Sequence, residues 1–345
     1  MVASFPQRKI GGTSVSALGL GCMGMSMSAL TGEKRDDEEI FNTLTTAADM
    51  GITFWDTSDF YLDNEEILGN WFSKTGRRKE IFLATKFGCK HGPGGLGDVQ
   101  ISGSPEYVRE SIEKSLKTLG TDYIDLYYVH RIDPRTPIEK TVEVLAELKL
   151  AGKIRHIGLS ECSSRTLERA SKVAKIDAVQ MEFSPFAMEI EDTGFKDVAR
   201  KLGVTIVPYS PLGRGFLSGA IKSRADFGPN DPRPRMHPRF SEENFPGNLK
   251  LVQIFEDIAK EKGVATGQVA LAWVLAQGDD FIPIPGTKRV KYLLENAGAV
   301  KVNFTDEDEK RVRSGLDAIG GAKGARYPEA NLAGCFGDSP ELGSV

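Results

Sequence analysis

Short apolar runs alternate with longer amphipathic segments along most of the chain. Each apolar run has the length of a buried strand, and each amphipathic segment repeats its apolar positions with the period of a helix. The runs begin near Ala17–Gly19 and continue as Thr53–Trp55, Ile81–Lys86, Ile124–Val129, Ile154–Leu159, Ala178–Met181, Thr205–Pro208 and Phe281–Pro283. This alternation of about eight strands with helices predicts an α/β fold, a closed (β/α)8 TIM barrel.

Start and stop signals mark several of the expected helices. Ser104 is expected to cap a helix with Pro105 in its first turn, and Gly120 ends that helix. Thr136 is expected to open the next helix in the same way, and Gly152 stops it. Because each such helix connects two strands, parallel pairing with crossovers follows.

Three segments fall outside this alternation. Residues 8–17 contain Gly11-Gly12 between two β-like pieces, which predicts a hairpin that could close the bottom of the barrel. Residues 213–248 are long, rich in proline and charged, which is typical of a functional loop. Thr305–Leu316 is expected to be a last helix capped by Thr305, and a glycine-rich tail follows over residues 320–345. We therefore expect one barrel domain over residues 1–345.

Composition narrows the possible partners. The chain has 345 residues, 40% of them hydrophobic and 27% charged, and its net charge of -4 offers no basic surface for nucleic acid or an anionic membrane. Its four cysteines lie far apart, without the spacing of a zinc site or a redox pair. The first residues lack a signal-type apolar core, and no stretch is long enough to span a bilayer. We expect a cytoplasmic protein with reduced thiols, no nucleic-acid or membrane partner and no metal, as a monomer or weak homo-oligomer.

Four ionisable residues lie where predicted strands end. Asp56, Lys86 and His130 end or follow three of the strands, and Tyr61 stands five residues beyond Asp56. Barrel enzymes build their active sites at this end of the strands. Taken singly, Asp56 could cap a helix, Lys86 could be a solvated charge, and Tyr61 and His130 could be packing residues. Their joint occurrence favours an active site.

These residue types support one kind of proton transfer. A tyrosine hydroxyl, with a reference pKa of about 10, is a poor acid at neutral pH, and a nearby ammonium such as that of Lys86 lowers its pKa. Asp56 would keep Lys86 charged and oriented, and a neutral His130 could hydrogen-bond a substrate carbonyl. Tyr61 could then protonate an oxygen as hydride arrives at its carbon.

The segments that hold these residues resemble the aldo-keto reductases. They read Gly51-Ile52-Thr53-Phe54-Trp55-Asp56-Thr57-Ser58-Asp59-Phe60-Tyr61, then Ala84-Thr85-Lys86, then Asp125-Leu126-Tyr127-Tyr128-Val129-His130. The resemblance runs from about Arg8 to about Leu316, and the family's Asp, Tyr, Lys and His tetrad falls on Asp56, Tyr61, Lys86 and His130. It implies a (β/α)8 barrel that reduces an aldehyde or ketone with NADPH and needs no metal. Ser210–Gly215 and Ile284–Arg289 are most similar to the branch of aryl-alcohol dehydrogenases, pyridoxal reductases and auxin-induced-type proteins.

Two other function classes remain as alternatives. Potassium-channel β-subunits resemble the same family and use the barrel as a cofactor-sensing regulatory partner. A metal-dependent barrel hydrolase would need several His or carboxylate ligands together, and the chain has only four histidines, which are His91, His130, His156 and His237.

The loop after the first strand admits two interpretations. Gly19-Leu20-Gly21-Cys22-Met23-Gly24 matches the G-x-G-x-x-G fingerprint of dinucleotide-binding Rossmann folds. That fingerprint must open a helix directly, whereas Met25–Ser28 intervenes, and the acidic residues Asp36–Glu39 start a helix instead of ending a strand. The barrel interpretation, with Gly21 and Met23 near the nicotinamide, is therefore preferred.

The resemblance assigns the nicotinamide end of the cofactor to later strand ends. Ser160 and Gln180 would hold the carboxamide, Asp56 would also contact the cofactor, and Tyr209 would stack on the ring. Glu161 stands where the family commonly has Asn, a departure from its pattern.

Two further segments are expected to bind phosphates. One loop offers backbone N–H groups and an arginine to a pyrophosphate, through Ser210, Leu212, Gly213, Arg214 and Gly215. Lys288 and Arg289 form a basic pair at a helix N-terminus, which suits the 2′-phosphate of NADP. The resemblance adds four residues of the adenosine side, Gly286, Thr287, Glu295 and Asn296. Gly286 and Tyr292 replace a frequent Lys and a frequent Arg of the family, and Lys288 and Arg289 are expected to compensate.

The substrate pocket has only candidate walls in the sequence. The candidates are Phe60, Trp71, Arg131, the 213–248 loop and the C-terminal tail. Each of these could equally be plain packing or a solvated loop.

Overall fold

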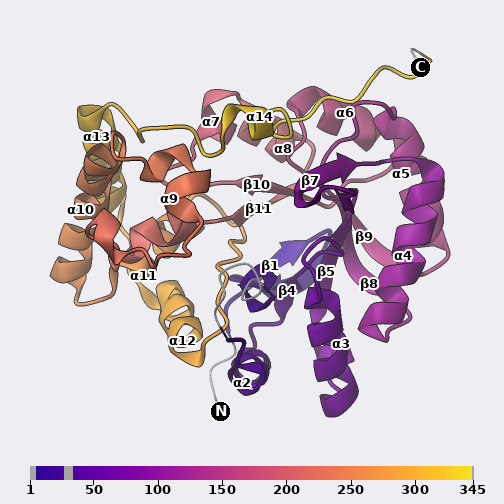
Figure 1. Cartoon of the computed structure of the whole chain (residues 1–345), viewed down its shortest axis with the longest axis horizontal. Helices are drawn as coiled ribbons and strands as arrows, with labels where there is room; N and C mark the ends of the chain where they lie inside the picture. The colour runs from indigo at the N-terminus through magenta and orange to yellow at the C-terminus, as the bar shows by residue number, and fades with distance from the viewer. Residues whose placement is uncertain (1–4, 27–33, 344–345) are drawn as a thin grey trace.

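A ring of parallel strands surrounded by helices forms the computed structural model of this chain (Figure 1). The structure describes residues 5–26 and 34–343. The first four residues, considered above for targeting, and Met27-Ser28 of the loop after the first strand lie outside the described residues.

Seven strands of the ring pair in parallel in the order β11-β10-β9-β8-β5-β4-β3. Their bounds are β3 Leu20–Gly21, β4 Phe54–Asp56, β5 Phe82–Phe87, β8 Ile124–Val129, β9 Ile154–Ser160, β10 Ala178–Glu182 and β11 Thr205–Tyr209. Seven of the eight expected strands are therefore present, and the first begins at Leu20, where pairing with Trp55 starts, and not at Ala17. The expected strand Phe281–Pro283 is not a regular strand.

The eighth position is filled by an extended segment without a regular ladder. The backbone N–H groups of Ile282 and Ile284 donate to β11 at 2.9 and 3.1 Å. On the side that faces β3, Pro283 and Pro285 have no N–H group to donate. Their carbonyl oxygens only accept hydrogen bonds, from the backbone N–H groups of Gly19 and Gly21. The ring therefore closes into the predicted (β/α)8 barrel, but half of the donors of its last pairing are missing.

Helices cover the outside of the ring on all sides (Figure 1). They are α2 Asp37–Asp49, α3 Asn64–Thr75, α4 Pro105–Leu119, α5 Ile138–Leu150, α6 Ser164–Val173, α7 Glu189–Asp192, α8 Phe195–Lys201, α10 Phe245–Lys262, α11 Thr266–Ala276, α12 Val290–Gly298 and α13 Asp306–Ile319. As expected, Ser104 caps α4 and Thr305 caps α13. The expected cap at Thr136 is wrong, because α5 begins at Ile138 and the Thr136 hydroxyl donates instead to Asp133 Oδ2 at 3.0 Å.

The predicted N-terminal hairpin closes the amino-terminal end of the barrel. Its strands are β1 Gln7–Ile10 and β2 Thr13–Ser16, which pair antiparallel. Ile10 and Val15 are fully buried in one apolar cluster with strand residues that include Phe54 and Phe82. The barrel interior is thus a packed core at this end, which leaves the opposite end for a site.

The opposite end is built up by segments that the sequence pattern did not resolve. An antiparallel hairpin of β6 Cys89–Gly92 and β7 Gly95–Ile101 follows β5 and was not predicted, since its glycine-rich strands lack an apolar alternation. The 213–248 loop contains short helical turns, among them η3 Gly213–Ser218 and α9 Arg233–Met236.

The C-terminal tail also lies against this end (Figure 1). It contains α14 Glu329–Leu332, and Gly337 then forms a parallel bridge with Cys162. The chain returns in this way from its last helix to the end of β9.

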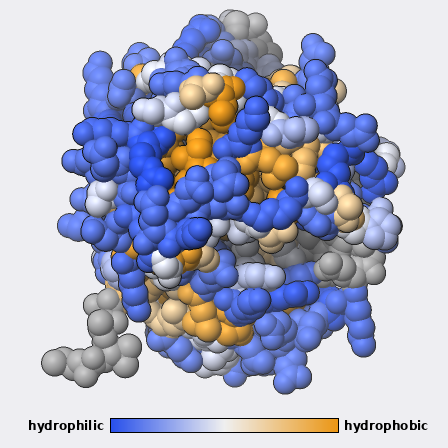
Figure 2. All heavy atoms as spheres, turned by 90° about the vertical axis from the view of Figure 1, so that its left-hand side faces the viewer, coloured by the Kyte–Doolittle hydropathy of each residue, from blue (hydrophilic) through white to orange (hydrophobic). Residues whose placement is uncertain are grey.

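The surface that carries α10 and α12 is largely hydrophilic, with hydrophobic side chains gathered toward its hollowed middle (Figure 2). This agrees with amphipathic helices that bury one face against the ring. Among the described helices, none combines the length and hydropathy needed to cross a membrane.

The Gly69→Ala variant tests the packing of α3 against α4. A Cβ at Gly69 would lie 2.5 Å from the backbone oxygen of Thr118, which cannot move without distorting α4. Ala normally favours a helix over Gly by about 0.5–1 kcal/mol. Overpacking against backbone costs about 1–3 kcal/mol, so we expect a lower free energy of unfolding, measured by urea denaturation.

Gly315→Ala is the matched control within α13. Its Cβ would meet mainly Ile254 Cδ1, the end of a flexible side chain that can rotate away. We expect its stability to be unchanged or slightly increased, and equal losses in both variants would contradict the packing argument.

Candidate active site

Strand ends bring together the four residues that the sequence singled out. Asp56 is the last residue of β4, and Lys86 is the last but one residue of β5. His130 directly follows β8, and Tyr61 lies in the loop between β4 and α3. Lys86 Nζ donates to Asp56 Oδ1 at 2.5 Å and to the carbonyl oxygen of Thr57 at 2.7 Å. The same Nζ lies 5.0 Å from the centroid of the Tyr61 ring. The Tyr61 and His130 rings meet edge to face with centroids 5.6 Å apart, so the four side chains lie together. Asp56, Lys86 and His130 are buried, and Tyr61 is partly buried.

Burial and charge set the protonation states of this group. Burial lowers the pKa of His130 well below its usual value, and the charges of Arg131 and Lys86 act in the same direction, so the imidazole is neutral near pH 7. Burial alone would lower the pKa of Lys86, but Asp56 and Tyr61 outweigh it and the pKa is raised. Lys86 is therefore an ammonium group.

The pKa of Tyr61 corrects one expectation. Burial raises the pKa of Tyr61 above its ordinary value, and Lys86 acts in the opposite direction without reversing the shift. The expectation of a net lowering by Lys86 is therefore wrong, although Lys86 does oppose the effect of burial. The phenol stays protonated throughout the neutral range.

Neighbouring side chains orient the group. Gln180 of β10 donates through Nε2 to Asp56 Oδ2 at 2.8 Å, which occupies the carboxylate oxygen that Lys86 leaves free. Ser58 Oγ lies 3.1 Å from His130 Nδ1. The sequence analysis did not single out Ser58, although its place two residues after Asp56 could have suggested it.

A second buried charge group lies at the ends of β9, β10 and β11. Glu161 accepts hydrogen bonds from Arg326 Nη1 and Nη2, each at 2.9 Å, and from the Tyr209 hydroxyl at 2.9 Å. Arg326 comes from the C-terminal tail and is 3% exposed. Glu161 itself has a positive φ of 51°, an uncommon conformation for a residue with a side chain. Glu161, the departure from the family pattern, therefore anchors the tail over the strand ends.

The electrostatics of Glu161 make this anchor depend on pH. Burial acts to raise its pKa, but Arg326 and Arg131 outweigh burial, so the pKa lies below the ordinary glutamate value. A lowered folded-state pKa contributes stability above the pKa of the unfolded carboxyl group, and this is lost as the pH falls through the folded value. No sequence signal pointed to Arg326.

The predicted cofactor residues after β9 and β11 lie on this same end of the barrel. Ser160 ends β9 and is buried, and Tyr209 ends β11. Positive φ angles recur along the following loop, at Ser210, Gly213, Arg214 and Gly215, with Leu212 between them. The Arg214 side chain donates to Glu182 Oε2 at 3.1 Å and lies over the Tyr327 ring, so the structure ties it to the tail-side charge group.

A basic cavity marks the other end of the predicted cofactor site. Lys34, Asp36, Lys288 and Arg289 line a hollow of about 500 Å³ at the start of α12. Lys34 was not among the predicted site residues. The cavity is rich in positive charge, which fits a phosphate group.

The remaining predicted cofactor-binding residues lie around β3 and in or just before α12. Gly286 bridges to Gly21 across the barrel seam, and Met23, just beyond β3, is 44% exposed. The Thr287 hydroxyl accepts from the backbone N–H of Arg289 at 3.1 Å, and Glu295 and Asn296 lie in α12. The expected helix start at Asp36 is confirmed, because its side chain caps α2 by accepting from Glu39 N at 3.0 Å.

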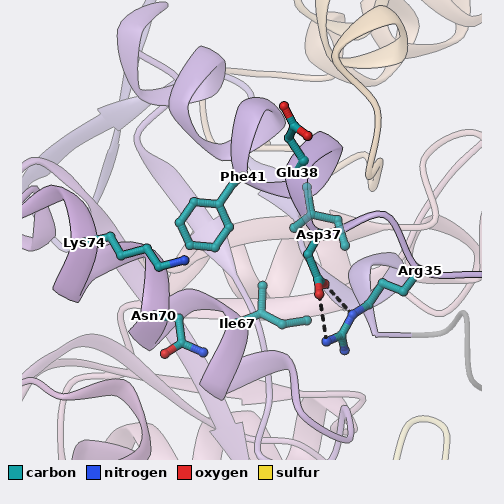
Figure 3. Close-up of a pocket in the computed structure, with 8 residues that line it drawn as sticks. Arg35, Asp37, Glu38, Phe41, Ile67, Asn70 and Lys74 are labelled. Atoms are coloured by element: carbon teal, nitrogen blue, oxygen red, sulfur yellow. Dashed lines mark hydrogen bonds and ion pairs between the residues drawn. The ribbon is translucent and has the colours of Figure 1, made fainter.

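A further hollow of about 450 Å³ lies between α2 and α3, away from these residues (Figure 3). Arg35 pairs there with Asp37 at 2.5 Å, and Lys74 lies 4.5 Å from the centre of the Phe41 ring. We assign no catalytic role to this hollow, because none of Asp56, Tyr61, Lys86 and His130 lines it. Across the part of the chain that the structure describes, no group of His, Cys, Asp and Glu side chains could hold a metal ion.

Comparisons with known proteins agree on one family. Residues 17–317 match the sequence model of the aldo/keto reductase family. The aldo-keto reductase yakc [NADP(+)] of Schizosaccharomyces pombe is 50% identical over 98% of this chain and 99% of its own length. The aldo-keto reductase str7 of Strobilurus tenacellus is 47% identical over 98% of both chains. A solved glycerol dehydrogenase of Gluconobacter oxydans superposes with a TM-score of 0.82 at 28% identity, covering 91% of this chain and 95% of its own.

Arg326→Met tests the anchoring of the tail. The change leaves the Glu161 carboxylate buried without its bidentate partner, and breaking a buried pair in this way costs about 3–5 kcal/mol. We expect a loss of that size in the free energy of unfolding, measured by urea denaturation.

Arg311→Met is the matched control, because Arg311 also donates through two nitrogens to one carboxylate, that of Glu261, at an exposed site. Its stability should change little, since water replaces the lost partner. Equal losses in the two variants would show that burial of Glu161 is not the cause.

Proposed function

This chain belongs to the aldo/keto reductase family, and we propose that it reduces an aldehyde or ketone to the alcohol with NADPH. One observation carries the proposal. Lys86 Nζ donates to Asp56 at 2.5 Å while it lies 5.0 Å from the centre of the Tyr61 ring, and His130 completes the same buried group. This arrangement supports a mechanism in which Tyr61 is the proton donor, Lys86 its positive neighbour and His130 a neutral hydrogen-bonding imidazole.

Tyr61 is proposed to donate the proton to the carbonyl oxygen. Its raised pKa keeps the hydroxyl protonated at neutral pH, so the proton is present when the substrate arrives. The phenolate that remains after transfer lies beside the Lys86 ammonium, which stabilises the negative charge. Asp56 holds Lys86 in place, and His130, neutral because of burial, orients the carbonyl oxygen.

The residues present fit NADPH at both ends of the site. Lys34, Lys288 and Arg289 would supply positive charge for a 2′-phosphate, and Thr287, Glu295 and Asn296 would contact the adenosine. Ser160 and Tyr209, which end β9 and β11, and Gln180 within β10 would contact the nicotinamide together with Gly21 and Met23, and residues 210–215 would contact the pyrophosphate. When bound, the reduced nicotinamide supplies a hydride. The printed name of the Schizosaccharomyces pombe relative, which specifies NADP(+), supports this choice.

Tyr61→Phe tests the proton donor. The ring and its packing stay while the hydroxyl is lost, so we expect the rate of carbonyl reduction to fall by about 10²–10⁴-fold. NADPH oxidation is followed at 340 nm over aromatic aldehydes, pyridoxal, diketones and aliphatic aldehydes, and NADPH binding by fluorescence.

NADPH should bind equally to the wild type and the variant, which separates lost chemistry from lost folding. Retained turnover in Tyr61→Phe would remove Tyr61 from its role. Tight NADPH binding by the wild type without turnover of any carbonyl would instead favour the regulatory-subunit alternative.

The pH dependence of reduction follows from two pKa shifts. The pKa of Tyr61 is raised above its ordinary value of about 10, so its proton is lost only in the alkaline range, and the pKa of His130 lies well below its ordinary value of about 6.5. We expect kcat/KM for reduction to be nearly constant from about pH 6.5 to 9 and to fall only above it. A titration step between about pH 6 and 8 would contradict a neutral His130.

A further inference from the structure

Arg131 is an arginine of the active-site end without a carboxylate partner. Nearly every arginine of the described residues forms an ion pair. Within residues 5–26 and 34–343 the exceptions are Arg131, Arg235 and Arg289, and the last two are exposed. Arg131 is partly buried, where an uncompensated charge costs more.

Arg131 is the chain neighbour of His130, whose ring meets the ring of the proposed proton donor Tyr61 edge to face. It directly follows His130, and its Nη1 folds back to donate to the His130 carbonyl oxygen at 2.8 Å. Its positive charge lowers the pKa of both His130 and Tyr61, which places the guanidinium within electrostatic reach of the reacting groups. The C-terminal tail packs against the Arg131 side chain, since a Cβ at Gly334 would lie 3.8 Å from both Cδ and Nε of Arg131.

The protein's own acids on this side are already engaged. Glu161 exerts some attraction on Arg131, but its two oxygens accept from Arg326 and one also accepts from Tyr209. Glu182 is paired with Arg214 and Arg239. Within the described residues, only Nη1 of Arg131 donates a hydrogen bond to the protein, while the charge of the guanidinium acts on Tyr61.

We propose that Arg131 binds an anionic oxygen group of the substrate, so that the preferred substrates are carbonyl compounds carrying a carboxylate near the reacting carbon. This inference rests on the proposed function and names its substrate class. A guanidinium presents its N–H groups in a planar fork that matches a carboxylate, which gives both attraction and orientation. With the carbonyl oxygen held by Tyr61 and His130 and the carboxylate by Arg131, two points of the substrate are positioned. Neutral aldehydes lack the second contact and leave the arginine unpaired.

A matched pair of substrates tests this assignment. The two probes are 4-carboxybenzaldehyde and methyl 4-formylbenzoate, which share the ring and the aldehyde but differ in charge. For the wild type we expect kcat/KM to favour the acid by roughly 10- to 100-fold, mainly through KM, because a hydrogen-bonded charge pair contributes about 1.5–3 kcal/mol.

Arg131→Gln should remove the preference for the acid, so that kcat/KM falls much more for the acid than for the ester, and Arg131→Lys should retain part of the preference. Arg109→Gln removes the same charge from an exposed site on α4, where it pairs with Glu147, and should leave the preference intact. An equal loss on acid and ester in Arg131→Gln would overturn the assignment, since it would mean a general effect on Tyr61 or on folding.

Binding measurements separate this inference from the proposed function and from an alternative source of the anion. Isothermal titration with 4-(hydroxymethyl)benzoate in the presence of NADP+ requires no turnover, and Arg131→Gln should weaken it by the same roughly 10- to 100-fold. The Kd for NADPH should not change, whereas a loss there would assign Arg131 to a cofactor phosphate and overturn the proposal. Reduction of the ester without preference for the acid would overturn the inference alone, and absence of any reduction would overturn the proposed function as well.

Discussion

The active-site end of this barrel depends on the ion pair between Lys86 and Asp56. Both side chains are buried, and transferring two separate charges from water would cost several kcal/mol each. They lie on adjacent parallel strands, so the sheet itself brings them together at 2.5 Å, and Gln180 and the Thr57 carbonyl satisfy further groups. The pair therefore fixes the Lys86 ammonium group next to Tyr61. A lysine side chain free in solvent would not hold its charge in one position.

The opposite side of the same end balances its charges through the tail. Arg326 reaches Glu161 from the far end of the sequence, and Arg214 and Arg239 pair with Glu182. Within the described residues, Arg131 differs from this group because it forms no ion pair with a carboxylate, although the charge of Glu161 acts on it. The distribution of charge supports the two roles that we propose, proton transfer around Lys86 and substrate recognition around Arg131.

Much of the fold was readable from local patterns. Apolar runs predicted seven of the strands to within a few residues, and Ser104 and Thr305 were recognised as caps because capping depends on neighbours only three positions away. The pattern did not show that Pro283 and Pro285 would leave the last pairing incomplete. It also missed the hairpin of β6 and β7, because these glycine-rich strands lack an apolar alternation.

The sequence by itself determined which residues stand at strand ends, and with them the group of Asp56, Tyr61, Lys86 and His130. A strand's end is a local property, and parallel strands of one barrel present their ends at one face. Only the tertiary structure decided the balance of charge around that group. It set the direction of the Tyr61 pKa shift, because burial competes there with Lys86, and it joined Arg326 to Glu161. Among residues 5–26 and 34–343 it also left Arg131 without an ion-pair partner. Burial and pairing over long sequence separations depend on how the whole chain packs, and no local pattern records them.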